Sequence, residues 1–150
     1  VLVSASLQDM IRSYKERHGD DYAWFVKEHA VQLNDTHPVM AIPELIRLLM
    51  ADGFTFEAAF QMARETFAYT NHTVMQEALE KWDVKLLNSV SPDMTLIIKQ
   101  LAKKQTAELK AAGIKDLTLK LYEGGRHEMF NETNREEVFR DVTAWIDSHI

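Results

Sequence analysis

The sequence predicts a helix-rich α/β domain that contains a small sheet of two or three parallel strands. Most apolar residues of the 150-residue chain recur at helical spacing, whereas residues 30–33 and 117–121 follow strand patterns. The long helical stretch between these two segments favours parallel strands joined by a right-handed crossover. A composition of 46% hydrophobic and 27% charged residues is ordinary for one globular domain.

The N-terminal third is expected to contain a helix, a short helix or loop, and the first strand. Apolar residues recur at helical spacing over residues 6–18, after serines that can cap the helix start. A Gly-Asp-Asp sequence ends this helix, and residues 22–29 follow as a short helix or a loop. The apolar run 30–33 then predicts a short buried strand.

The middle of the chain predicts three further helices. Pro43 suits the first turn of a helix that ends at about residue 52, because a missing N–H costs nothing there. Thr55 begins the next helix, which is expected over residues 55–70, and a third helix covers about residues 75–87. Phenylalanines at helical spacing on the second of these helices are assigned to the core: Phe56, Phe60 and Phe67.

The C-terminal third predicts a long helix, the second strand and a final helix. The long helix enters through Pro92, is amphipathic over about residues 95–112 and stops at Gly113. Residues 117–121 alternate leucine with polar residues, which is the period of a half-buried strand. The final helix starts after residues 131–134 and carries an apolar stripe: Val138, Val142, Trp145 and Ile146.

Charge and composition exclude several classes of function. A net charge of −6 provides no basic stripe for nucleic acid, and the absence of cysteine excludes disulfides and thiolate metal sites. The six histidines form no H-E-x-x-H motif or i, i+4 pair, so no metal site is expected. We find no signal peptide and no run of the roughly 20 apolar residues that span a membrane. A soluble, cytoplasmic protein without nucleic-acid or membrane partners is therefore expected.

The polar run that follows the first strand, "NDTHP", has two interpretations. Side chains at the carboxyl end of a strand can form a binding site, since open α/β folds bind ligands there. The same residue types also punctuate chains between elements, and Asp35 can cap the helix that follows, at a cost of about 1 kcal/mol for its loss. Residue patterns by themselves favour the turn and leave the binding site open.

Three longer segments provide further information: "VSASLQDMIRSYKER", "VQLNDTHPVMAIPELIRLL" and "AYTNHTVMQEALEKWDVKLL". Over about residues 1–101 the chain resembles the α-glucan phosphorylases, which act on glycogen, maltodextrin or starch. The resemblance implies that Asp35 and His37 stand beside the glucosyl subsite and that His72 presents its main-chain carbonyl to the sugar. It also implies that the pyridoxal phosphate of these enzymes belongs to a large C-terminal domain. We therefore expect these residues to bind no cofactor and to show no phosphorylase activity.

The last third of the chain suggests another family through "ELKAAGIKDLTLKLYEGGRHEMFNETNREEVFRDVTAWIDSHI". Over about residues 105–150 it is similar to the C-terminal part of α/β-hydrolases of the monoacylglycerol-lipase and lysophospholipase type. This similarity places His127 at the general base. A base of this kind needs a serine nucleophile and an orienting acid, and no G-x-S-x-G elbow occurs in the chain.

The two resemblances meet inside the helix at about residues 95–112, without a linker. We therefore expect one domain, residues 1–150, and an engineered or designed chimera, a synthetic de novo protein without native catalytic activity. One alternative is residual, weak glucan binding through the phosphorylase-like segment. Another is a weak serine-hydrolase or esterase remnant that uses His127. Apolar surface left uncovered by this recombination favours self-association.

Overall fold

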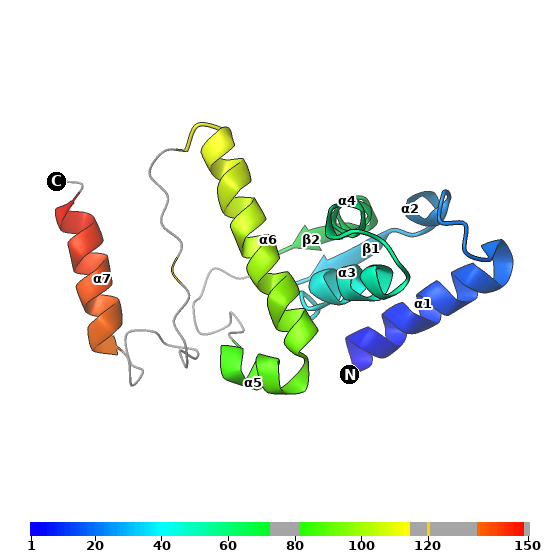
Figure 1. Cartoon of the computed structure of the whole chain (residues 1–150), viewed down its shortest axis with the longest axis horizontal. Helices are drawn as coiled ribbons and strands as arrows, with labels where there is room; N and C mark the ends of the chain where they lie inside the picture. The colour runs from blue at the N-terminus through cyan, green and yellow to red at the C-terminus, as the bar shows by residue number, and fades with distance from the viewer. Residues whose placement is uncertain (73–81, 115–119, 121–134, 149–150) are drawn as a thin grey trace. The chain divides into compact units, whose positions relative to one another are not determined.

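A computed structural model of the chain describes residues 1–72, 82–114, 120 and 135–148. The chain divides into two compact units, Val1–Val74 and Met75–Ile150, and each is described by itself. The first unit contains four helices and both described strands (Figure 1): α1 (Leu2–His18), α2 (Phe25–Glu28), β1 (Val31–Asn34), α3 (Ala41–Ala51), α4 (Phe56–Thr66) and β2 (Phe67–Thr70).

The sheet of the first unit consists of β1 and β2, which run parallel. The register pairs Val31 with Phe67 at one end and Asn34 with Thr70 at the other. The connection between the strands runs through α3 and α4. The prediction of a helix-rich α/β fold with a small parallel sheet is therefore confirmed.

The identity of the second strand differs from the prediction. We expected one helix over residues 55–70, but α4 ends at Thr66 and Phe67 is already extended, with φ −99° and ψ 136°. Residues 67–70 are aromatic, small or β-branched, and their backbone groups gain ladder partners in β1. Pairing with β1 therefore stabilises an extended conformation here, although the phenylalanines recur at helical spacing. The strand expected at 117–121 lies outside the described residues, apart from Lys120.

The core of the first unit forms where α1, α3 and α4 pack together. Helix α3 contacts both α1 and α4, and it buries Leu45, Ile46 and Leu49 completely. Helix α4 contributes the small residues Ala59 and Ala63, while its phenylalanines remain half-buried. These small side chains allow the backbones of α3 and α4 to approach closely, and the phenylalanines of α4 therefore flank the contact between α3 and α4.

An aromatic cluster joins α1 to the short helix α2. Tyr14 and Phe25 are both fully buried, and their ring centroids lie 5.2 Å apart at an interplanar angle of 81°. The Tyr14 hydroxyl donates a hydrogen bond of 2.7 Å to the carbonyl oxygen of Asp21. This edge-to-face contact is a favoured aromatic geometry. It anchors the loop that leads from α1 into the sheet.

The second unit contains three described helices: α5 (Val84–Val90), α6 (Pro92–Ala111) and α7 (Arg135–Asp147). Helix α6 confirms the predicted long helix, because Ser91 accepts a hydrogen bond from the Met94 amide, Pro92 occupies the first turn and Gly113 follows the end with φ 93°. Helix α5 packs against α6. Of the helix expected at 75–87, residues 75–81 lie outside the described residues. Residues 82–83 are not helical, because the Asp83 side chain caps a new helix, α5, and accepts hydrogen bonds from the amides of Lys85 and Leu86.

The buried face of α6 includes Met94 and Ile97. The amphipathic pattern of residues 95–112 also places Leu96 within the apolar stripe, but 59% of its surface is exposed. Residues 94 and 97 are three apart and share a helix face, so residue 96 points elsewhere. Of the apolar residues expected on α7, Val138 is buried and the others remain partly exposed.

Two other expectations concern the whole chain: its organisation as one domain and its lack of a membrane-spanning segment. The proposal of a single domain over residues 1–150 stays a prediction. Within the described residues, none of the helices combines the length and the apolar character needed to cross a bilayer.

Candidate binding site at the strand ends

The carboxyl ends of β1 and β2 lie at the same edge of the sheet. Because the strands are parallel and Asn34 pairs with Thr70, the residues that follow each strand emerge side by side. One segment is the turn that begins at Asp35, and the other contains Asn71 and His72. This edge is where open α/β sheets place ligands.

Asp35 adopts an unusual backbone conformation at this edge, with φ 61°. Its amide N–H donates a 2.8 Å hydrogen bond to the carbonyl oxygen of Thr70, so it continues the strand pairing by one residue. Its side-chain Oδ1 accepts a 3.0 Å hydrogen bond from the main-chain N–H of His72. Aspartate is among the few residue types other than glycine that tolerate this left-handed region.

The structure therefore corrects the interpretation of Asp35 as a helix cap. Helix α3 begins at Ala41, its N-cap is Met40, and no side chain caps it. The turn before it is closed by main-chain bonds, including one of 2.8 Å from the Ala41 amide to the Pro38 carbonyl. Pairing of β1 with β2 brings the Asp35 carboxylate to His72, which is 37 residues away in sequence.

The other residues of the turn and of the segment after β2 remain accessible. His37 and His72 are both exposed, while Asp35 and Thr36 are half-buried. His37, Thr36 and Asn71 each interact with other groups in the structure. The described bond joins Asp35 to His72, and the structure places His37 on the same turn as Asp35.

A side-chain contact at this edge was not predicted from the sequence. Gln32 of β1 donates a 2.8 Å hydrogen bond from Nε2 to the hydroxyl oxygen of Thr70 on β2. Gln32 is exposed, whereas the next residue, Leu33, is buried, as the alternation of a strand requires. That alternation is the signal that places Gln32 on the outer face, but the identity of its partner depends on the unexpected strand.

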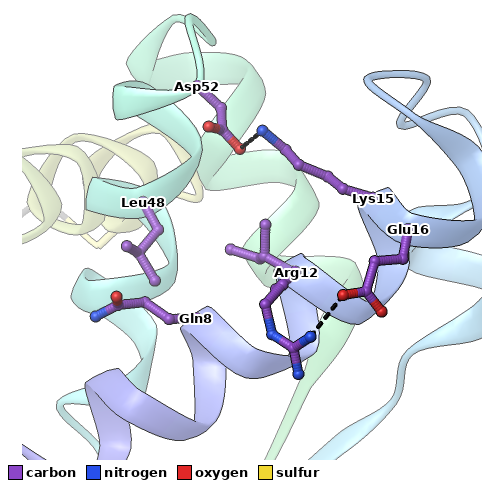
Figure 2. Close-up of a pocket in the computed structure, with 7 residues that line it drawn as sticks. Gln8, Arg12, Lys15, Glu16, Leu48 and Asp52 are labelled. Atoms are coloured by element: carbon purple, nitrogen blue, oxygen red, sulfur yellow. Dashed lines mark hydrogen bonds and ion pairs between the residues drawn. The ribbon is translucent and has the colours of Figure 1, made fainter.

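A groove between α1 and α3 is a competing site in the first unit. It has a volume of about 510 Å³ and is lined by Gln8, Ile11, Arg12, Lys15, Glu16, Leu48 and Asp52. Its charges compensate one another (Figure 2): Lys15 Nζ lies 2.9 Å from Asp52, and Arg12 lies 2.5 Å from Glu16. A charged ligand therefore finds no uncompensated charge among these pairs.

The proton affinities in this groove follow from the same pairs. Burial opposes ionisation of Asp52, but hydrogen bonds from Tyr22 and Lys15 outweigh it and lower the Asp52 pKa. Burial, followed by the hydrogen bond to Asp52, raises the pKa of Tyr22. With these pKa shifts Asp52 stays ionised and Tyr22 stays protonated at neutral pH, so the charge pair that ties α1 to the end of α3 is maintained. We assign the groove a structural role.

Metal chemistry has no candidate centre in the regions that the structure describes. Within them, no three side chains of histidine, cysteine, aspartate or glutamate are arranged to hold a metal ion. His127, which the hydrolase resemblance singled out, lies outside the described residues. The strand ends around Asp35 and His72 are therefore the candidate site.

Comparison with known protein families gives matches along most of the chain. The model of the family described as "Phosphorylase: Carbohydrate phosphorylase" matches residues 1–149. Alpha-glucan phosphorylase 1 of Arabidopsis thaliana is 46% identical over 103 residues, which cover 67% of this chain and 11% of that protein. The H isozyme of alpha-glucan phosphorylase from Vicia faba is 47% identical over 109 residues, or 71% of this chain and 13% of that protein.

A further relative comes from another lineage. Glycogen phosphorylase 2 of Dictyostelium discoideum is 44% identical over 102 residues, which cover 67% of this chain. The chain spans about a tenth of the length of this relative, since the matched part is 10% of that protein.

These matches overturn the interpretation as a designed chimera. The family match over residues 1–149 includes the segment 105–150 that we compared with α/β-hydrolases, and nothing supports a hydrolase segment. The esterase alternative based on His127 loses its basis for the same reason. Expecting a synthetic, non-catalytic protein also conflicts with matches to enzymes. The hydrolase resemblance was drawn from this C-terminal stretch as a whole, and the family match extends over the same residues.

Proposed function

This chain belongs to the carbohydrate phosphorylase family, and we propose that the strand ends that carry Asp35, His37 and His72 form one wall of a glucosyl-binding site. Several relatives are named α-glucan phosphorylases or glycogen phosphorylase, which indicates a glucan as the bound substrate. The resemblance of the "NDTHP" and "YTNHT" motifs to that family supports the choice of these three residues. The 3.0 Å bond from the His72 amide to Asp35 carries the proposal, because it joins the two motifs.

The chemistry of the strand ends suits a sugar. Glucosyl hydroxyls are both donors and acceptors, and the site offers imidazoles and main-chain carbonyls. The exposed positions of His37 and His72 leave these groups accessible to a ligand. One wall buries only part of a sugar, so we expect binding by these 150 residues to be weak, with a Kd of about 1 mM or above.

For the whole protein, we propose phosphorolysis of an α-glucan. A phosphate oxygen forms a bond to C1 of the terminal glucosyl unit, the bond from C1 to the next unit breaks, and the released oxygen takes up a proton. In this reaction the wall positions the glucosyl unit. Residues 34–37 and 70–72 include no lysine, so these residues do not fit a Schiff-base cofactor.

A titration of the 150-residue chain with maltoheptaose tests the binding site. We expect the amide resonances of residues 35–37 and 71–72 to shift in ¹⁵N–¹H spectra at millimolar sugar, and His37→Ala to weaken binding at least threefold. Gln100→Ala on exposed α6 is the control and should leave the affinity unchanged. Cellohexaose, which has β-linkages, tests linkage specificity. Half-saturation is expected at about 1 mM maltoheptaose. The proposal is wrong if about 20-fold this concentration shifts none of these amide resonances.

A further inference from the structure

We propose that Asp35 is a positioning residue, whose carboxylate holds the backbone of His72 in place instead of contacting the sugar. This inference rests on the proposed glucosyl site. It assigns to Asp35 a role that differs from the direct contact implied by its place beside the subsite. The observations behind it are the strand pairing, the backbone angle of Asp35 and the bond to His72.

The first step concerns the hydrogen-bond pattern of the sheet. In a parallel ladder, a residue donates its N–H to one residue of the partner strand and accepts from the residue two positions later. Asp35 donates to the carbonyl of Thr70 at 2.8 Å, so the regular pattern predicts that its main-chain carbonyl accepts from His72. The observed acceptor of the His72 N–H is the Asp35 side chain, at 3.0 Å. The side chain thus takes the position of a ladder carbonyl.

The second step concerns which residue types can adopt this backbone conformation and accept the His72 N–H with a side-chain atom. A positive φ of 61° takes Asp35 out of the extended conformation. The chain can turn away here while the partner strand keeps its hydrogen bond, provided that the side chain supplies an acceptor. Aspartate and asparagine both have an acceptor at Oδ1 and tolerate the left-handed region. Glycine tolerates the angle but lacks the acceptor, and alanine lacks the acceptor and is strained.

The third step concerns the carbonyl oxygen of His72, which this hydrogen bond leaves available to a ligand. The bond uses the N–H of His72, and its carbonyl oxygen takes no part. Because the peptide bond is planar and trans, fixing this N–H also fixes the plane of the peptide that joins Asn71 to His72. The Cα of His72 is then held at the sheet edge, which reduces the ordering cost of presenting its carbonyl to a ligand.

These steps separate a positioning role from a direct contact. If Asp35 only accepts a hydrogen bond from His72, an uncharged asparagine should serve almost equally well. If the carboxylate instead binds a sugar hydroxyl, loss of its charge should weaken sugar binding. A direct sugar contact loses a charge-assisted hydrogen bond in Asp35→Asn and predicts weaker binding, whereas a positioning role requires only that Oδ1 still accepts from the His72 amide, which amide exchange measures separately.

The experiment compares Asp35→Asn, Asp35→Gly and Asp35→Ala in the full 150-residue chain. Amide hydrogen exchange at His72 reports the hydrogen bond, and exchange at Leu33 reports whether the strands remain paired. We expect protection of His72 in the parent and in Asp35→Asn, and at least a tenfold loss of protection in Asp35→Gly and Asp35→Ala. Protection of Leu33 should persist in Asp35→Gly.

Titration with maltoheptaose then tests the consequence for binding. We expect Asp35→Asn to bind within twofold of the parent and Asp35→Gly to bind about threefold to tenfold more weakly. Weaker binding by Asp35→Asn with His72 still protected overturns the proposal in favour of direct contact. Unchanged protection of His72 in Asp35→Gly overturns the assigned hydrogen bond. If the parent binds no sugar but His72 loses protection in Asp35→Gly, the glucosyl site is wrong, and the backbone assignment stands.

Discussion

Removal of the Glu44 carboxylate tests how the first unit holds α1 against α3. The Glu44 residue is 3% exposed on α3 and accepts three hydrogen bonds. Two come from Arg47, at 2.8 Å from Nε and 2.8 Å from a terminal nitrogen, and one comes from the Ser4 hydroxyl of α1 at 2.5 Å. A bidentate pair of this kind is stronger than a single contact.

The magnitude follows from what each substitution leaves behind. Breaking a buried pair costs about 3–5 kcal/mol when the remaining charge stays buried. Arg47 has a side-chain exposure of 29%, so water can solvate part of its charge after Glu44→Ala. We therefore expect Glu44→Ala to lower the free energy of unfolding by about 2–3 kcal/mol. Glu44→Gln keeps an acceptor for Ser4 or Arg47 and should lower it by about 1 kcal/mol.

The pH dependence provides a second signature. Burial opposes ionisation of Glu44, but hydrogen bonds from Arg47 and Ser4 outweigh it and lower its pKa below the ordinary 4.5. A lowered pKa in the folded state means that the stabilisation is complete above the unfolded pKa and is lost as the pH falls through the folded pKa. Stability of the parent should therefore fall with acid more steeply than that of Glu44→Gln.

Urea unfolding monitored by circular dichroism at pH 7 and pH 3 measures both effects, with amide exchange at Leu45 reporting the first unit. Glu65→Ala and Glu65→Gln are matched controls, because Glu65 is exposed on α4, and each should change stability by less than about 0.5 kcal/mol. A cost below about 1 kcal/mol for Glu44→Ala, or equal acid dependence in the parent and Glu44→Gln, would refute this reasoning.

Two further predictions concern single hydrogen bonds of the first unit. Thr55→Ala should lower the free energy of unfolding by about 1 kcal/mol, because the Thr55 hydroxyl accepts a hydrogen bond from the Ala58 amide at the start of α4. Urea unfolding measures this cost, and the control Thr55→Ser should be nearly neutral in the same measurement. Tyr14→Phe should cost about 1 kcal/mol, since it keeps the buried ring and removes the donor to Asp21, and an unchanged thermal midpoint would contradict this role.

Local interactions explain why several elements were predictable. Thr55 and Pro92 mark helix starts through contacts with residues at most a few positions away, so their effects can be recognised in sequence. Residues 31–34 form a strand in the structure, close to the expected 30–33, because a short apolar run bounded by polar residues suits a buried strand. The motif residues of the candidate site were found from family resemblance, and residue patterns alone favoured a plain turn.

The sequence by itself determined the helix starts, the first strand and the chemical types available at the candidate site. Only the tertiary structure decided that residues 67–70 form the strand β2 and do not continue α4. In an extended conformation their backbone N–H and C=O groups need hydrogen-bond partners on another strand, and β1 provides them. That pairing then decided the partner of Asp35, since no helix-capping rule connects residues 37 positions apart. Local sequence patterns cannot predict long-range strand pairing, because its hydrogen bonds join segments that have no fixed separation in the sequence.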